Sequence, residues 1–210
     1  MRSIKNLSRR TFAWTAAGLG STAVAGVLAA SMGLTPASAT STAAHSASTF
    51  TFALVPSPNI AACLPNAGGS ATITTGKQND TMKVSIHGMP KNAGFDLFVI
   101  QQPLAPFGVS WYQTDVNAND EGVGSATVKG VFDSETFSVS PGGTVTFPPT
   151  NQYHLGLWFN NPQTPFNLGC EPGATTPIVT PFNGAHHAGV QVLNTSEFPV
   201  AAGPLSQVHR

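Results

Sequence analysis

The sequence predicts an all-β protein, an antiparallel two-sheet sandwich with Greek-key connections, with a closed β-barrel as the alternative. Short runs rich in Val, Ile, Phe and Thr are separated by Gly, Pro, Asn and Asp clusters at intervals of about ten residues. The 17 prolines are scattered where long helices would need to lie, and no helical stripe beyond residue 39 exceeds two turns. Short strands with frequent turns are typical of sandwiches and barrels.

The predicted strands follow one another along the chain. They are 50–55, 70–75, 82–87, 95–101, 109–115, 124–132, 136–139, 144–147, 153–159, 176–180 and 189–193. In 82–87, apolar Met82, Val84 and Ile86 alternate with polar residues, which predicts one buried and one solvated face. The run 95–100 becomes apolar on both faces, as expected of a central strand.

Part of the chain resembles secreted Ig-like modules. The stretch Val-Ser-Ile-His-Gly-Met-Pro, the run Gly-Phe-Asp-Leu-Phe-Val that begins at Gly94, and Thr114-Asp115 give the order strand, turn, strand, acidic hairpin. The resemblance covers roughly residues 80–132. It implies an Ig-like sandwich and names no function.

The N-terminus resembles a twin-arginine export signal. The motif residues are Ser8, Arg9, Arg10 and Phe12. An uncharged run over 11–34 follows and ends at the small-residue site formed by Ala37 and Ala39, so cleavage is expected after Ala39. A membrane anchor is the alternative for so long a run, but its glycines and serines make it weakly apolar. The resemblance implies export of the folded chain by the twin-arginine translocase, to a secreted or cell-wall location, without a transmembrane anchor in the mature form.

The sequence predicts four parts of the chain. They are a signal peptide (1–39), a flexible Ser, Thr and Ala lead-in (40–48), one β-domain (49–205) and a C-terminal tail (206–210). The β-domain, at about 155 residues, is long enough to bury a substantial core.

The two cysteines, Cys63 and Cys170, are expected to form a disulfide in an oxidising compartment. Two separate buried thiols are the alternative. By the chain-entropy estimate, closing so long a loop raises the free energy of unfolding by roughly 4–5 kcal/mol. Export in the folded state implies that the fold forms first and that the bridge locks it afterwards.

The charge balance restricts the partners. Without the leader, five basic residues stand against nine acidic ones, so the mature chain is near −4. Nucleic acid and anionic membranes call for clustered Lys and Arg, and we expect neither as a partner. Because only 9% of the residues are charged, the surface is expected to be rich in uncharged polar side chains, as in many extracellular β-proteins.

A predicted hairpin carries oxygen ligands at alternate positions: Asp115, Asn117, Asn119 and Glu121. This spacing lets one turn fold around calcium and resembles the start of an EF-hand-type loop. The pattern departs from that loop where Asp120 replaces its glycine and Ala126 its final glutamate. A plain hairpin with Asx turns is the alternative.

Three histidines, His154, His186 and His187, are candidate ligands for copper or zinc. Adjacent histidines on a strand point to opposite faces, so His186 and His187 bind one ion only from a loop, which the glycines around them allow. Hydrogen-bonded surface or edge histidines are the alternative.

Aromatic side chains offer a candidate binding surface. Trp111 and Tyr112 are adjacent on one predicted strand, so one of them points outward if the sheet has a solvated face, and Trp158 lies in similar polar surroundings. Exposed rings are typical of sugar-binding and protein-binding faces, whereas core packing is the alternative.

The sequence contains no Gly-x-Ser-x-Gly elbow, no His-Glu-x-x-His and no phosphate-binding glycine loop. The predicted function is therefore a secreted, non-catalytic binding or cell-surface structural module whose partner is a cell-wall glycan or an extracellular protein. The alternative is a copper- or zinc-dependent oxidoreductase or metal carrier that uses His154, His186 and His187.

Overall fold

Alternating burial defines the strands of the structure, a computed structural model that describes residues 47–132, 151–181 and 188–208. In β3 (Asp80–His87), Met82, Val84 and Ile86 are buried, whereas Lys83 and His87 are exposed to solvent. This pattern places one face of the strand against a core, as the alternation in the sequence predicts. The prediction of an all-β fold is confirmed.

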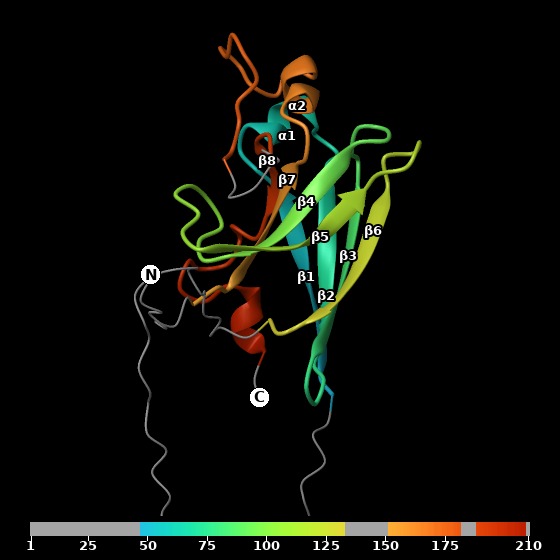
Figure 1. The fold of residues 1–210 in the computed structure, drawn as a ribbon, viewed down its shortest axis with the longest axis vertical. Helices are drawn as coiled ribbons and strands as arrows, with labels where there is room; N and C mark the ends of the chain where they lie inside the picture. Colours follow the sequence, from blue (N-terminus) through green and yellow to red (C-terminus); the bar gives the residue numbers. More distant parts are fainter. Residues whose placement is uncertain (1–46, 133–150, 182–187, 209–210) are drawn as a thin grey trace, which may run out of the picture. The chain divides into compact units, whose positions relative to one another are not determined.

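The described residues contain eight strands and three short helical segments (Figure 1). The other strands are β1 (Thr49–Pro56), β2 (Gly68–Thr74), β4 (Gly94–Ile100), β5 (Ser110–Asn117), β6 (Gly124–Gly130), β7 (His154–Phe159) and β8 (Gln191–Asn194). The helical segments are α1 (Ile60–Cys63), α2 (Gln163–Asn167) and the 3₁₀ turn η1 (Pro204–Gln207).

The strands form one antiparallel sheet in the order β5-β4-β7-β8-β1-β2-β3-β6. Strand β1 joins its two halves, because 49–54 pair with β2 while Val55 and Pro56 pair with β8. The two end strands, β5 and β6, are joined by a tight turn and linked by the bridge between Ala118 and Gly124. The sheet is therefore nearly closed, which brings it closer to the barrel alternative than to two separate sheets.

Apolar side chains from nearly all the strands fill the inside of this sheet. Phe52, Met82, Phe95 and Leu157 belong to this inner cluster. Leu205 of η1 also joins it, and so does Val208. The ordered fold therefore continues beyond residue 205, where the sequence predicts a tail.

A second, smaller cluster lies on the outer face of β4 and β7. Phe98, Ile100, Trp158 and Ala188 are buried there, and Phe107 packs against them. Strand β4 contributes apolar side chains to both clusters, and its sequence is therefore apolar on both faces. Its predicted interior position is confirmed, since it lies between β5 and β7.

One predicted strand, 176–180, is absent from the described structure. Only Thr180 makes an isolated bridge, to Ala188. Pro177 supplies no backbone N–H, and the N–H of Ile178 donates to the Glu171 carboxylate at 2.8 Å in place of a neighbouring strand. The β-rich composition of this segment therefore does not produce a sheet strand.

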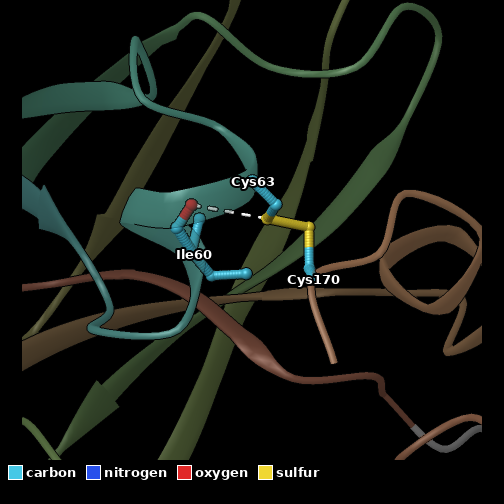
Figure 2. Close-up of a disulfide and its surroundings, with 3 residues drawn as sticks. All are labelled: Ile60, Cys63 and Cys170. Atoms are coloured by element: carbon cyan, nitrogen blue, oxygen red, sulfur yellow. Dashed lines mark hydrogen bonds between the residues drawn. A yellow bond between two sulfur atoms is a disulfide. The ribbon is translucent and has the colours of Figure 1, made fainter. Parts of the chain in front are cut away.

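The disulfide between Cys63 and Cys170 joins the end of α1 to the segment that follows α2 (Figure 2). The two Cα atoms are 5.2 Å apart across a sequence separation of 107 residues. The Cys63 sulfur lies 3.4 Å from the Ile60 carbonyl oxygen, a contact drawn in Figure 2. The predicted pairing is confirmed.

Several sequence predictions lie outside the described residues. They are the export motif, the cleavage site at Ala37 and Ala39, the strands at 136–139 and 144–147, and His186 and His187. Among the residues that the structure does describe, no helix is long and apolar enough to span a membrane.

Candidate binding surface

The two aromatic residues predicted for a binding surface are both solvent-exposed on β5. Trp111 retains 46% of its accessible surface and Tyr112 retains 49%. Trp111 lies opposite Val99, which belongs to the inner cluster, and Tyr112 lies opposite Phe98, which belongs to the outer cluster. Residues directly opposite one another share a face of the sheet, so the two rings lie on opposite sides of the strand.

A β-bulge interrupts the pairing of β5 with β4. Leu97 lies opposite Thr114 and Phe98 lies opposite Tyr112, which leaves Gln113 as an extra residue on β5. An extra residue reverses the facing of everything beyond it. Without the bulge, residues 112 and 115 would face opposite sides of the sheet.

The bulge brings Tyr112 and Asp115 together on the outer side. The Tyr112 hydroxyl donates a hydrogen bond of 2.8 Å to Asp115 Oδ1. Asp115 lies directly opposite Asp96 of β4, so two carboxylates share this part of the sheet. Partial burial, followed by the effects of Asp115 and then Asp96, raises the pKa of Tyr112 to about 12.

The loop that leads into β5 is closed by its own hydrogen bonds. The Gln101 N–H donates to the Val109 carbonyl at 2.9 Å, and the Val109 N–H donates back to Gln101 Oε1 at 3.2 Å. The Gln102 N–H donates to the Phe107 carbonyl at 3.0 Å. Gly108 has a φ of +68°, a left-handed conformation that favours glycine. These contacts close 101–109 into a hydrogen-bonded loop.

A buried polar network fastens this loop to the sheet. Gln191 Nε2 donates to the Pro103 carbonyl at 3.0 Å. The Ser57 hydroxyl donates to Gln191 Oε1 at 3.0 Å, and Asn194 Nδ2 donates to Ser57 Oγ at 3.0 Å. The loop is thus anchored to β8 and to the residue that follows β1. No sequence signal marks these partners, because Ser57 is 134 and 137 residues away from the other two.

The anchored loop and β5 present four exposed apolar side chains within 104–112. They are Leu104, Val109, Trp111 and Tyr112, and we refer to them as the β5 surface. Phe107 of the same loop turns inward and packs on Trp158, with ring centroids 4.8 Å apart. A surface that is ordered before binding loses less entropy when a partner docks.

The prediction of Trp158 as a binding residue is wrong, because this side chain is 0% exposed. Phe98 and Phe107 approach it edge-on, with ring centroids 5.5 and 4.8 Å from its own. Gly156 makes room for the indole, since a Cβ at that position would collide with the Trp158 ring. Trp158 therefore stabilises the outer cluster instead of contacting a ligand.

The predicted calcium loop forms a tight β-turn. Asn119 Oδ1 accepts hydrogen bonds from the N–H groups of Glu121 at 2.9 Å and Val123 at 3.0 Å, as in an Asx turn. The Asp115 carboxylate accepts the tyrosine hydroxyl described above, and Asn117 is exposed at the end of β5. In the described part of the chain, no three His, Cys, Asp or Glu side chains are placed to hold a metal ion.

His154 is a buried structural residue at the start of β7. Its Nε2 lies 3.0 Å from the Val200 carbonyl and its Nδ1 lies 2.9 Å from Thr195 Oγ1. Because a carbonyl only accepts, Nε2 carries the proton, and Nδ1 of the neutral ring accepts from the threonine. Burial lowers the pKa of His154, partly offset by its backbone hydrogen bonds. Both ring nitrogens are thus engaged within the fold, and His186 and His187 lie outside the described residues.

No known protein family matches the chain, and no curated protein is similar to it in sequence. The features that bear on function are therefore the geometry of the β5 surface and the motifs at the N-terminus.

Proposed function

We propose that the chain is exported by the twin-arginine route and acts outside the cell as a non-catalytic binding domain whose partner docks on the β5 surface. The observation that carries this proposal is the exposure of Trp111 and Tyr112, side by side in sequence on a strand that ends the sheet. Trp and Tyr are the side chains most enriched among residues that dominate binding energy.

The contrast with Trp158 supports the proposal. The outer face of this fold has a covered aromatic cluster in which an aromatic side chain can be buried. The exposure of Trp111 and Tyr112 is therefore not explained by the absence of such a cluster. The loop before β5 sends Phe107 into that cluster and leaves Leu104 and Val109 outside. Four exposed apolar side chains within one anchored stretch are typical of an interaction site.

Three further features support the export part of this proposal: the arginine pair, the disulfide and the charge of the mature chain. The motif Arg9-Arg10 implies passage through the twin-arginine translocase. The disulfide between Cys63 and Cys170 suits an oxidising compartment. Sparse charge and a mature net charge near −4 fit a soluble extracellular domain.

The surface is tested by binding to isolated cell walls and cell-surface protein of the producing organism. We expect the purified full chain to cosediment with one of these fractions. The double variant Trp111→Ala, Tyr112→Ala is expected to weaken retention by about tenfold or more, the scale of a binding hot spot.

The control variant is Val123→Ala, because Val123 is equally exposed, at 46%, but lies in the turn between β5 and β6. This variant is expected to bind like the unsubstituted chain. Equal binding by the double aromatic variant and the control would remove the β5 surface from the proposal.

The export route is tested separately with Arg9→Lys, Arg10→Lys. We expect this variant to remain inside the cell, since the motif requires the arginine pair. The measurement is immunodetection in cells and culture medium. Undiminished secretion of the lysine variant would mean that another route exports the chain.

A further inference from the structure

We infer that the chain has a second docking surface, on the outer face of β1, β2, β3 and β6, which binds an acidic polysaccharide through serine, threonine and lysine side chains. This inference goes beyond the proposed function, which concerns the β5 surface. The four strands lie side by side in the sheet (Figure 1). We refer to the outward-facing residues of 49–53, 70–74, 81–85 and 125–129 as the hydroxyl face.

Burial and strand pairing define which side chains belong to this face. In β1, Phe52 is buried against the inner cluster while Thr51 is exposed to solvent, and the other three strands alternate in the same way. The pairing places the outward residues of the four strands opposite one another, in rows across the sheet. Every residue in these rows is Ser or Thr except Ala53, Lys83 and Lys129. The hydroxyl face therefore carries neither a carboxylate nor an aromatic ring.

The hydroxyl groups of β1 and β2 are ordered by bonds to one another. Thr51 Oγ1 lies 2.8 Å from Thr72 Oγ1, and Thr49 Oγ1 lies 3.1 Å from Thr74 Oγ1. A hydroxyl has one donor hydrogen and two acceptor lone pairs, so each bonded pair can still donate to and accept from the hydroxyls of a sugar. Because the pairs are formed before a ligand arrives, less entropy is lost when it binds.

The lysines make this face cationic within an acidic domain. Beyond residue 39 the chain has only five basic residues, and two of them, Lys83 and Lys129, are exposed on the hydroxyl face. A third, Lys77, lies in the hairpin between β2 and β3. Lys83 pairs with Thr127, so Lys129 is its diagonal neighbour on β6, about 7–8 Å away. Neither lysine makes an ion pair within the described residues. Two neighbouring ammonium groups without a carboxylate beside them are complementary to an anionic ligand.

The composition of the face selects a polysaccharide among anionic partners. A protein partner is usually held by large apolar or aromatic anchors, and the hydroxyl face has none. Nucleic acids and anionic membranes call for denser clusters of Lys and Arg. An acidic polysaccharide offers hydroxyl groups to the Ser and Thr rows and spaced carboxylates to the lysines. Its carboxylates supply the attraction that a neutral sugar would obtain by stacking on a ring.

The test measures retention of the purified full chain, with its disulfide intact, on immobilised polygalacturonate. The same polymer with its carboxylates methyl-esterified is the matched control ligand, and double-stranded DNA is a third ligand. A chelator is present so that divalent cations do not bridge carboxylates. We expect the chain to bind polygalacturonate about tenfold or more tightly than the methyl ester or DNA, and to bind it more weakly as salt is added.

Lys83→Gln and Lys129→Gln are the decisive variants, and Lys91→Gln is their matched control, because Lys91 is an exposed lysine between β3 and β4, outside the hydroxyl face. We expect each decisive variant to lose about threefold or more in polygalacturonate binding and the control to lose nothing. The double variant Thr51→Val, Thr72→Val removes one hydroxyl pair while keeping β-branched side chains that suit a strand, and we expect it to weaken binding by about threefold as well.

The outcomes separate the hydroxyl face from the β5 surface. Equal retention on polygalacturonate and its methyl ester, equal retention on DNA, or equal losses in Lys83→Gln and Lys91→Gln overturns the acidic-polysaccharide inference. The inference also fails if Trp111→Ala abolishes polygalacturonate binding while Lys83→Gln preserves it, and the β5 surface then remains as the binding site. If Lys83→Gln weakens this binding while cell-wall and surface-protein retention is indifferent to Trp111→Ala, the inference holds and the proposed function fails.

Discussion

Strands β5 and β7 carry the same kind of residue and use it in opposite ways. Trp158 of β7 is completely buried, whereas Trp111 of β5 keeps almost half of its surface in water. Strand β7 lies between β4 and β8 with a loop over its outer face, and β5 ends the sheet. Position in the sheet, and what covers each face, therefore decides whether a tryptophan is buried in the fold or stays exposed to solvent.

Removing each tryptophan side chain is expected to change stability by very different amounts. Trp158→Ala should destabilise the protein by about 3–5 kcal/mol, because it opens a cavity among Phe98, Phe107 and Ala188. Trp111→Ala should cost less than about 1 kcal/mol, since the removed ring is half exposed. Urea unfolding of both variants measures the difference. Similar losses of stability would show that the two tryptophans do not differ as described.

Gly156→Ala is expected to destabilise the fold by about 1–3 kcal/mol through overpacking. The added Cβ would meet the Trp158 ring and the Gln191 side chain. As a control, Gly173→Ala introduces a methyl where nothing lies within 4 Å, so its cost comes from the positive φ alone. If Gly156→Ala is as stable as the unsubstituted protein, the Trp158 indole shifts to accommodate the added methyl group without a loss of stability.

The stability of the fold is expected to depend on pH through His154 of β7. Burial holds the pKa of His154 on β7 below the ordinary value of 6.5. The unfolded chain then takes up the proton first, so this group contributes full stability above pH 6.5 and loses it as the pH falls toward the folded pKa. Denaturant unfolding between neutral and mildly acidic pH measures the slope. His154→Gln should flatten it, and an unchanged slope would assign the effect to other groups.

Tyr112 of β5 is expected to give the weakest of these effects, a pH dependence of stability in the direction opposite to that of His154. Tyr112 has a pKa raised to about 12 from 10.0, so the folded state keeps its proton in alkali and this contribution to stability is lost as the pH rises from 10 toward 12. Absorbance of the phenolate should show one tyrosine titrating late. Asp115→Asn should bring that titration to lower pH, and the same late titration in this variant would exclude Asp115 as a cause.

Local patterns in the sequence predict much of the sheet. Alternation in β3 gives the correct buried face, and the doubly apolar run in β4 predicts its interior position. The same rule fails at 176–180, because Pro177 and the bond from Ile178 to Glu171 replace sheet pairing. Strand propensity describes a half-buried surface, and it cannot tell whether a neighbouring strand is present.

The candidate site is harder to predict because it depends on contacts distant in sequence. Nothing around Trp158 indicates that Phe107 covers it, although Gly156 two residues earlier is a signal for close packing. The facing of Tyr112 and Asp115 depends on the bulge at Gln113, which appears only in the pairing with β4. The pairing of Cys63 with Cys170 was predictable because only two cysteines are present.

The disulfide between Cys63 and Cys170 has a consequence for how the domain withstands proteolytic cleavage. Cys63 precedes β2 and Cys170 follows β7 in the sequence. A single cut in any loop between the two cysteines therefore leaves both pieces covalently connected. The pieces also remain paired within the sheet, since β3 pairs with β6 and β4 with β7. A chain nicked between residues 101 and 109 should migrate as one molecule on a non-reducing gel and as two after reduction. For this domain, cleavage and loss of the fold are separate events.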